Sequence, residues 1–348
     1  MRLLPATCRE FFCPNIRGCP IWRICLLFPG VKYCIIDERK RYALFFVKHG
    51  KKRLERTLQM AEYTLITDST CDLDADLYKN MGVRVITMRY TVDAREYVDD
   101  GTNDSHAFYE MLHNGASAST MQINAQTYID IFEEELSKGR DVIYLCFASV
   151  LSGSYNNAQY AAKECGEKWP ERRVIVIDSK SECGGEGLLA YHAAEQKKAG
   201  LAFDALAAWI QDAIQRHCHY FTVSDLNHLY RGGRVSRGAA VMGTLVGIKP
   251  VMYTNSKGEL CVGAKVRGRM QAVRMLADKV AAKITEPEKQ LVLINHADCM
   301  EDAQRLADDI RSRVNPAEIR ILNLGPVIGA HVGPGCLAVF FVGANRDW

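Results

Sequence analysis

The sequence predicts a two-domain α/β protein, with an N-terminal α/β/α domain built on a parallel sheet and a C-terminal α/β domain built on a mixed sheet. From Met60 onward, apolar strand-like runs alternate with helical patterns, which is typical of a parallel sheet covered by helices. After about residue 219, a β-hairpin pattern appears among the alternating elements, so antiparallel strands join parallel ones. The chain has 348 residues, 48% of them hydrophobic, which suits roughly two globular domains. We therefore expect domains at 60–218 and 219–348.

Residues 1–59 differ from the rest of the chain. They hold a cluster of five of the thirteen cysteines: Cys8, Cys13, Cys19, Cys25 and Cys34. These cysteines include no C-x-x-C pair, which disfavours zinc, and no apolar run approaches the roughly 20 residues needed to cross a bilayer. A basic stretch follows the apolar one without a cleavage site, which argues against a secretory signal. We expect Met60 to be the true start, with 1–59 either mistranslated or a poorly packed tail outside the fold.

The first predicted domain begins with a buried strand, "YTLITD", and has a central strand, "DVIYLCFA", that is apolar on both faces. Strands are predicted at 63–68, 83–92, 141–148 and 172–179. Helices are predicted at 74–82, 105–115, 127–139, 152–170, 184–200 and 203–217, the last two as amphipathic helices. These elements place the carboxyl ends of the strands, with the turns that follow them, at one edge of the sheet.

The second predicted domain mixes a hairpin with helix and strand repeats. Strands are predicted at 220–225, 248–254, 259–266, 290–297, 318–324 and 336–343. Helices are predicted at 226–233, 235–247, 269–284 and from Asp298 onward. Gly258 occupies the hairpin turn.

Charge and composition exclude several function classes. The formal net charge is +3 on 44 basic and 41 acidic residues, so no global field attracts nucleic acid or a membrane surface. The eight cysteines after residue 59 are scattered, which favours free thiols in a reducing cytoplasm. The glycine clusters "GGEG" and "GPGC" match neither nucleotide fingerprint, and we predict no cofactor.

Two hydroxyl-bearing turns are candidates for binding an anion. Ser152, Gly153 and Ser154 follow a predicted strand and open a helix, where free backbone N–H groups and a close backbone approach attract negative charge. Thr120 precedes the helix begun near Ala125. Plain helix N-capping explains either hydroxyl equally well at this stage.

Three other polar groups are candidates. The turn Asp68-Ser69-Thr70 follows the first strand at the same sheet edge. His331 lies in a Gly/Pro-rich turn, "GPVIGAHVGPGC", where glycines leave room for a ligand, although a core histidine is the alternative. Arg231, Arg234 and Arg237 form a basic cluster that is either solvated charge or a docking patch for an acidic partner.

Taken together, these motifs resemble the DegV family of bacterial proteins, some of which serve as the fatty-acid-binding subunit of fatty acid kinase. The resemblance runs from about Tyr63 to Gly343. It is carried by "DSTCDL", "STMQIN", "SVLSGSYNNA", "RGGRVS", "GIKPVM", "KVRGRMQAV" and "GPVIGAHVGPGCLAV". The chain departs from the family pattern at Met121 and Ile123, where the family has Ser and Pro.

The resemblance implies a DegV-like two-domain fold and a carrier of long-chain fatty acids that is not itself an enzyme. Thr120 and Ser152 would bind the fatty-acid carboxylate, with Gly153 beside them, and His331 would support that site. Asp68, Ser69 and Ser149 would be supporting residues. Arg231, Arg234 and Arg237 would contact a separate fatty acid kinase in the cytoplasm.

Physical chemistry agrees with such a ligand. Burial of an acyl chain stabilises a complex by about 0.8 kcal/mol per CH₂, so some fourteen methylenes supply on the order of 11 kcal/mol. A head-group hydrogen bond contributes only about 1 to 3 kcal/mol. The tail would supply affinity in an apolar interdomain tunnel, for which "AAVMGTLVGI" and "LAVFFV" are the expected walls, and the head would supply orientation.

Two alternatives remain open from the sequence. One is an enzyme like dihydroxyacetone kinase, in which His331 would attack a carbonyl covalently, an argument that rests on fold analogy alone. The other is a regulatory protein that binds phosphate or another small metabolite at the Ser152 turn.

Overall fold

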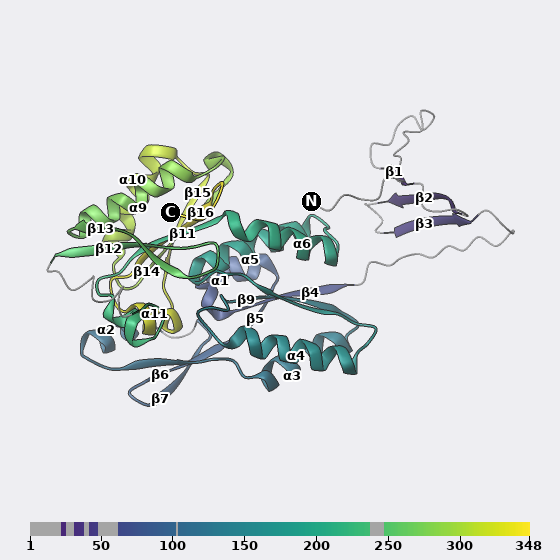
Figure 1. Ribbon diagram of the computed structural model, residues 1–348, viewed down its shortest axis with the longest axis horizontal. Coiled ribbons are helices and arrows are strands. Elements are labelled where there is room, and N and C mark those ends of the chain that lie inside the picture. The colour runs from purple at the N-terminus through teal and green to yellow at the C-terminus, as the bar shows by residue number, and fades with distance from the viewer. Residues whose placement is uncertain (1–21, 26–30, 38–41, 48–61, 102–103, 237–246) are drawn as a thin grey trace. The chain divides into compact units, whose positions relative to one another are not determined.

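The computed structural model in Figure 1 describes residues 22–25, 31–37, 42–47, 62–101, 104–236 and 247–348. The chain divides into two compact units, Met1–Glu62 and Tyr63–Trp348. In the first unit, β1 (Trp22–Cys25), β2 (Val31–Asp37) and β3 (Tyr42–Val47) form an antiparallel sheet in the order β1-β2-β3. The second unit carries everything that follows. The division at residue 219 and the start at Met60 stay predictions.

The second unit opens with a four-stranded parallel sheet in the order β10-β9-β4-β5. Its strands are β4 (Tyr63–Asp68), β5 (Arg84–Ile86), β9 (Asp141–Cys146) and β10 (Val174–Asp178). The predicted interior position of β9 is confirmed, and all six of its residues are buried. Successive side chains of β9 alternate between two cores, Tyr144 with Phe132 on one face and Leu145 with Ile210 on the other.

Helices cover both faces of this sheet, as Figure 1 shows. The helices of this part of the chain are α1 (Ala75–Met81), α3 (Ala125–Ser137), α4 (Ser154–Lys168), α5 (Cys183–Lys198) and α6 (Phe203–Ala213). Helices α3 and α4 lie on one face, whereas α5 and α6 lie on the other. The predicted α/β class with a parallel N-terminal sheet is therefore confirmed.

A second, antiparallel sheet in this region corrects the strand predicted over 83–92. That stretch forms two strands, β5 in the parallel sheet and β6 (Met88–Val92) in a three-stranded sheet ordered β7-β6-β8. The partners of β6 are β7 (Arg95–Asp99) and β8 (Ala118–Met121), and α2 (Ser105–His113) connects them. The apolar alternation continues through both strands without a turn signal, so the sequence did not reveal the change of sheet.

The C-terminal part of the second unit is built on a six-stranded mixed sheet in the order β13-β12-β11-β16-β14-β15. Its strands are β11 (His217–Thr222), β12 (Ile248–Thr254), β13 (Leu260–Arg267), β14 (Leu291–His296), β15 (Glu318–Asn323) and β16 (Leu337–Val342). The pair β14 and β15 is parallel and the other described pairs are antiparallel. The predicted mixed sheet is confirmed.

Helices α9 (Arg269–Lys283) and α10 (Met300–Val314) pack on one face of the six-stranded sheet. The short helices α7 (Asn227–Arg231) and α11 (Pro326–Val332) contact each other. Three-residue 3₁₀ turns lie at Ser69–Cys71, Ile214–Arg216 and Pro287–Lys289. Most of the helix predicted at 235–247 lies outside the described residues.

Helix α5 lies between the two larger sheets, which corrects its prediction as an amphipathic helix. It contacts β11, β14 and β16, and its first eight residues are all buried. Its glycines make this possible: a Cβ on Gly184 would lie 2.2 Å from Asn295 Oδ1, and one on Gly185 would lie 2.1 Å from His219 Cε1. The "GGEG" cluster therefore serves close packing between helix and sheet.

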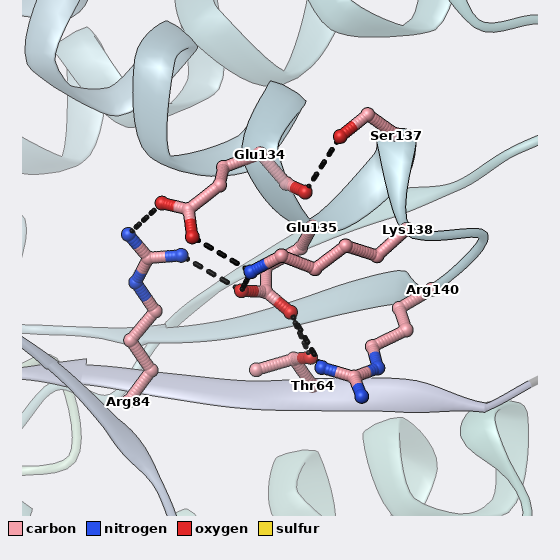
Figure 2. Close-up of polar contacts among 7 residues, drawn as sticks. All are labelled: Thr64, Arg84, Glu134, Glu135, Ser137, Lys138 and Arg140. Carbon is pink, nitrogen blue, oxygen red and sulfur yellow. Dashed lines mark hydrogen bonds and ion pairs between the residues drawn. The ribbon is translucent and has the colours of Figure 1, made fainter.

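A network of charged side chains joins β4 and β5 of the parallel sheet to helix α3 (Figure 2). Glu135 is buried and accepts hydrogen bonds from Thr64 Oγ1 at 2.7 Å and Arg84 Nη1 at 2.7 Å. Lys138 and Arg140 also approach its carboxylate, at 3.2 and 3.5 Å. Burial acts to raise the pKa of Glu135, but these hydrogen bonds outweigh it and lower the pKa to about 2.

Candidate functional site

A cavity of about 540 Å³, counting the open space at its mouth, collects the predicted site residues. The polar side chains in its wall are Thr70, Thr120, Ser152, Glu182, Arg234 and His331. The apolar wall includes Leu229, Leu260, Val327 and Ile328. Thr120, Ser152 and His331, which are far apart in sequence, are thus brought together, and the lining comes from both predicted domains.

Thr120 and His331 form the polar centre of the cavity. Thr120 lies on β8 and not at a helix N-cap, because Asn124 caps α3 through the Thr127 amide. Its Oγ1 lies 2.9 Å from His331 Nε2. His331 lies on α11, not in the predicted turn, because Gly325 and Pro326 start a helix that ends at Gly333.

The protonation of His331 determines what Thr120 offers. Burial, and then the nearby Arg234, lower the pKa of His331 to about 4, so the imidazole is neutral at pH 7. Its Nδ1 is buried and has no hydrogen-bond partner among the described residues. A bare lone pair there costs less than an orphaned N–H, so we assign the proton to Nε2, which donates to Thr120 Oγ1. The Thr120 hydroxyl proton is then free to donate into the cavity.

Ser152 lies in the loop that follows β9, directly before α4. Its Oγ accepts from the Ser154 amide at 3.2 Å and donates to Ser154 Oγ at 3.1 Å. The helix begins at Ser154, two residues later than predicted, and its N-cap is Gly153, which forms no side-chain cap hydrogen bond. The Ser154 amide is thus bonded to Ser152, and the Asn156 and Asn157 amides donate to Gly153 O, while the positive end of the α4 dipole still favours an anion here.

Arg234 gives the cavity a cation that the sequence did not assign to it. Its Nε donates to Leu151 O at 3.0 Å and its Nη1 donates to Gly232 O. Within the described residues, the guanidinium forms no ion pair and Nη2 has no acceptor. A half-buried, unpaired guanidinium beside two hydroxyls can hold a carboxylate or a phosphate.

The mouth of the site is a second hollow of about 570 Å³, which includes open solvent. It shares Thr120, Ser152 and Arg234 with the first cavity and adds the exposed Gln122 and Gly153. A Cβ on Gly153 would lie 2.2 Å from Gln122 Oε1, so the glycine allows the Gln122 side chain to approach. The polar groups therefore lie between the apolar wall and the protein surface.

An apolar hollow of about 330 Å³, which includes open solvent, adjoins the first cavity. The two share Glu182, Leu260, Ile328 and Val332. From the predicted wall "LAVFFV", Ala338 and Phe340 line this hollow, whereas Leu337, Val339 and Phe341 pack against α9 and α10. Most of the other predicted wall, residues 239–246, lies outside the described residues.

The proposed supporting residues use their side chains elsewhere. The Ser69 hydroxyl donates to Asp99 at 3.0 Å, and the Ser149 hydroxyl donates to Asp178 at 2.6 Å. Asp68 is fully buried and accepts from Tyr144 OH at 2.9 Å and from Thr70. None of the three is among the cavity-lining residues.

The loop without the family proline is held in another way. Ile123 is buried, and its carbonyl accepts from Asn157 Nδ2 at 2.8 Å. Asn124 follows as the helix cap, while Met121 is 36% exposed. The buried Ile123 side chain and the hydrogen bond from Asn157 therefore restrict the loop backbone, as a proline would do.

Sequence reasoning missed Arg234 and Glu182 as cavity residues. Arg234 follows Gly232 and Gly233, and this glycine pair next to an arginine was a signal that the chain turns back there. Arg231 is exposed, with its Nη2 3.1 Å from His228 Nδ1, and Arg237 lies outside the described residues. Their role in docking stays a prediction.

Two negative findings apply to the described ranges. No group of three or more His, Cys, Asp and Glu side chains is arranged there to hold a metal ion. No helix in those ranges combines the length and apolar character needed to span a bilayer.

The fold and site define a class of α/β proteins with an apolar cavity. At one end of this cavity lie a guanidinium, from Arg234, and two hydroxyls, from Thr120 and Ser152. The family described as "uncharacterised protein, DegV family" matches residues 62–344. A DegV domain-containing protein of Clostridium perfringens is 39% identical over 290 residues, covering 83% of this chain and 100% of that protein. The chain belongs to the DegV family.

Solved structures of this family share the fold. A DegV family protein from Thermus thermophilus, described by its fatty acid binding, is 26% identical with a TM-score of 0.74, and the match covers 81% of this chain and 99% of that one. A fatty acid binding DegV family protein from Streptococcus agalactiae is 27% identical with a TM-score of 0.73, covering 82% and 100%.

Proposed function

We propose that this protein binds one long-chain fatty acid, with the carboxylate at Thr120, Ser152 and Arg234 and the acyl chain in the apolar cavity behind them. The observation that carries the proposal is the unpaired Arg234 guanidinium at the polar end of an otherwise apolar cavity. The fatty acids named for the relatives from Thermus thermophilus and Streptococcus agalactiae support it.

The proposal gives each polar side chain a role. His331 holds Thr120 Oγ1 at 2.9 Å, so that the threonine proton is aimed at one carboxylate oxygen. Ser152 rotates its proton away from Ser154 to donate to the other, and Arg234 supplies the balancing charge. The chain then runs along Leu260, Ile328 and Val332 toward Phe340, in a tunnel between the two proposed domains.

In this proposal the protein is a carrier and the phosphorylation of the carboxylate is the work of a separate fatty acid kinase in the cytoplasm. The hollow at Gln122 and Gly153 leaves the head group open to such a partner. In the same proposal the exposed Arg231, three residues before Arg234, contacts the kinase.

The test is mass spectrometry of lipid extracted from protein purified without detergent. The wild type should retain fatty acid, and the double variant Thr120→Ala/Ser152→Ala should retain none. The matched control is Thr91→Ala/Ser119→Ala, a Thr–Ser pair 2.8 Å apart on the same small sheet but outside the cavity. Wild-type lipid content in the first double variant would refute the proposal.

A phosphate-binding regulator would use the same Arg234 and Ser152. Competition separates the two: inorganic phosphate should not displace oleate at millimolar concentration if the acyl chain supplies most of the affinity.

A further inference from the structure

Glu182 places a carboxylate in the wall of the apolar cavity. The residue immediately precedes α5, is 9% exposed, and lines both the head-group cavity and the inner apolar hollow. It therefore lies where the interior of an acyl chain would pass, beyond the head group and before the end formed by Phe340.

One oxygen of this carboxylate is occupied and the other is not. Oε1 accepts from Thr254 Oγ1 at 2.7 Å and lies 3.0 Å from His219 Nδ1. Oε2 is buried and has no hydrogen-bond partner among the described residues. A buried carboxylate oxygen without a donor is unfavourable, and an alkyl chain in contact with it supplies none.

The surroundings hold the Glu182 side chain in one position. His219 is fully buried, which lowers its pKa, and Ser181 Oγ lies 3.3 Å from its Nε2. His219 therefore donates one proton, from Nδ1 to Oε1. The fully buried Arg346 adds a nearby positive charge, and its own N–H groups go to backbone carbonyls, not to Oε2.

We infer that Glu182 Oε2 accepts a hydrogen bond from the ligand, so that the preferred ligand is a long-chain fatty acid with a hydroxyl group in the interior of its chain. The donors to Oε1 come from β11 and β12, so Oε2 is the oxygen of this cavity-lining side chain that has no donor among the described residues. A hydroxyl there forms a charge-assisted hydrogen bond, whereas an unsubstituted chain leaves Oε2 unpaired. This inference rests on the proposed binding of a fatty acid.

The experiment compares delipidated protein titrated with stearic acid, with hydroxystearic acids that differ in the hydroxyl position, and with an oxostearic acid substituted at the preferred carbon. The wild type should bind at least one mid-chain hydroxystearic acid about tenfold or more tightly than stearic acid. It should bind the oxo compound more weakly than its hydroxy counterpart, because a ketone offers no proton.

Two variants give the inference a specific signature. Glu182→Leu should reverse the preference, so that stearic acid binds more tightly than the hydroxy isomer. Glu182→Gln keeps an acceptor for Thr254 and His219 but replaces Oε2 by an NH₂ donor, so the oxo compound should gain affinity relative to the wild type. Leu260→Ala, a matched change in the same wall, should weaken stearic and hydroxystearic acids by the same factor.

The outcomes separate the two proposals. If the wild type binds stearic acid as tightly as every hydroxy isomer, or if Glu182→Leu and Glu182→Gln both keep the wild-type preference, the inference on Glu182 is wrong while fatty acid binding stands. If neither stearic nor any hydroxystearic acid binds, the proposed function itself fails. Because Glu182→Leu removes a buried polar contact, thermal unfolding of each variant is measured first, and Glu182→Gln alone decides the question if the leucine variant does not fold.

Discussion

Arg234 provides the sharpest test of how the head group is held. In Arg234→Met the side chain keeps an unbranched apolar stem but loses the guanidinium, and with it the charge and all of the N–H donors. Two of those donors bond to the carbonyls of Leu151 and Gly232, which leaves Nη2 for the ligand. The variant therefore removes one charge-assisted contact from the carboxylate and leaves the apolar cavity intact.

The expected loss of oleate affinity follows from this one lost contact. A hydrogen bond to a charged group contributes about 1.5–3 kcal/mol, and the half-buried position of Arg234 keeps solvent screening moderate. The dissociation constant for oleate at pH 8 should therefore rise roughly 10- to 150-fold. Methyl oleate has no charge, so its affinity should change little.

Calorimetric titration of delipidated protein measures both ligands. Arg305→Met is the matched control, because Arg305 is exposed on α10 and bonds to acidic side chains of its own helix. Equal losses for oleate and methyl oleate, or an unchanged oleate affinity, would show that the guanidinium does not bind the carboxylate.

Three further predictions concern local geometry and pH. Gly232→Ala places a Cβ 2.5 Å from His331 Nδ1 and should lower fatty acid retention, whereas Gly166→Ala, with open space around its Cβ, should raise stability by about 0.5–1 kcal/mol in urea unfolding. Burial raises the pKa of Asp99 to about 6, so protonated Asp99 adds fully to the free energy of unfolding at low pH, and this contribution is lost as the pH rises through 6. Asp99→Asn should therefore make the free energy of unfolding vary less between pH 4 and 7. The pKa of Glu135 is lowered to about 2, so ionised Glu135 stabilises the fold at neutral pH and this contribution is lost as the pH falls through 2. Glu135→Gln should therefore lower the melting temperature at pH 7 and have little effect near pH 2.

Patterns with local causes were predictable from the sequence. Strand β9 is apolar on both faces because it is interior, and α1 begins after a capping Asp74 and ends before Gly82. Thr120, Ser152 and His331 were candidates from their local sequence, only the resemblance linked them in one site, and the structure brings all three to one cavity. Residue spacing alone did not predict this, because the three belong to separate elements.

Features that depend on tertiary packing were not predictable. Helix α5 was predicted to be amphipathic, but its first eight residues are buried because it lies between two sheets, and Gly329 inside α11 made that helix resemble a turn. Arg234 was assigned to the surface because it belongs to a basic cluster, whereas the turn at Gly232 and Gly233 directs it to the cavity. A single sequence does not predict the direction that the chain takes after such a turn.

The glycine contacts of α5 have a mechanical consequence. Gly184 and Gly185 bring the backbone of α5 into direct contact with Asn295 and His219. Because such close-packed interiors have low compressibility, α5 holds the two sheets at a fixed separation. The wall that carries Glu182 is therefore a fixed boundary, and a guest molecule must adapt its length and its kinks to it. A side chain at either glycine would overlap Asn295 or His219 and should therefore destabilise this packing.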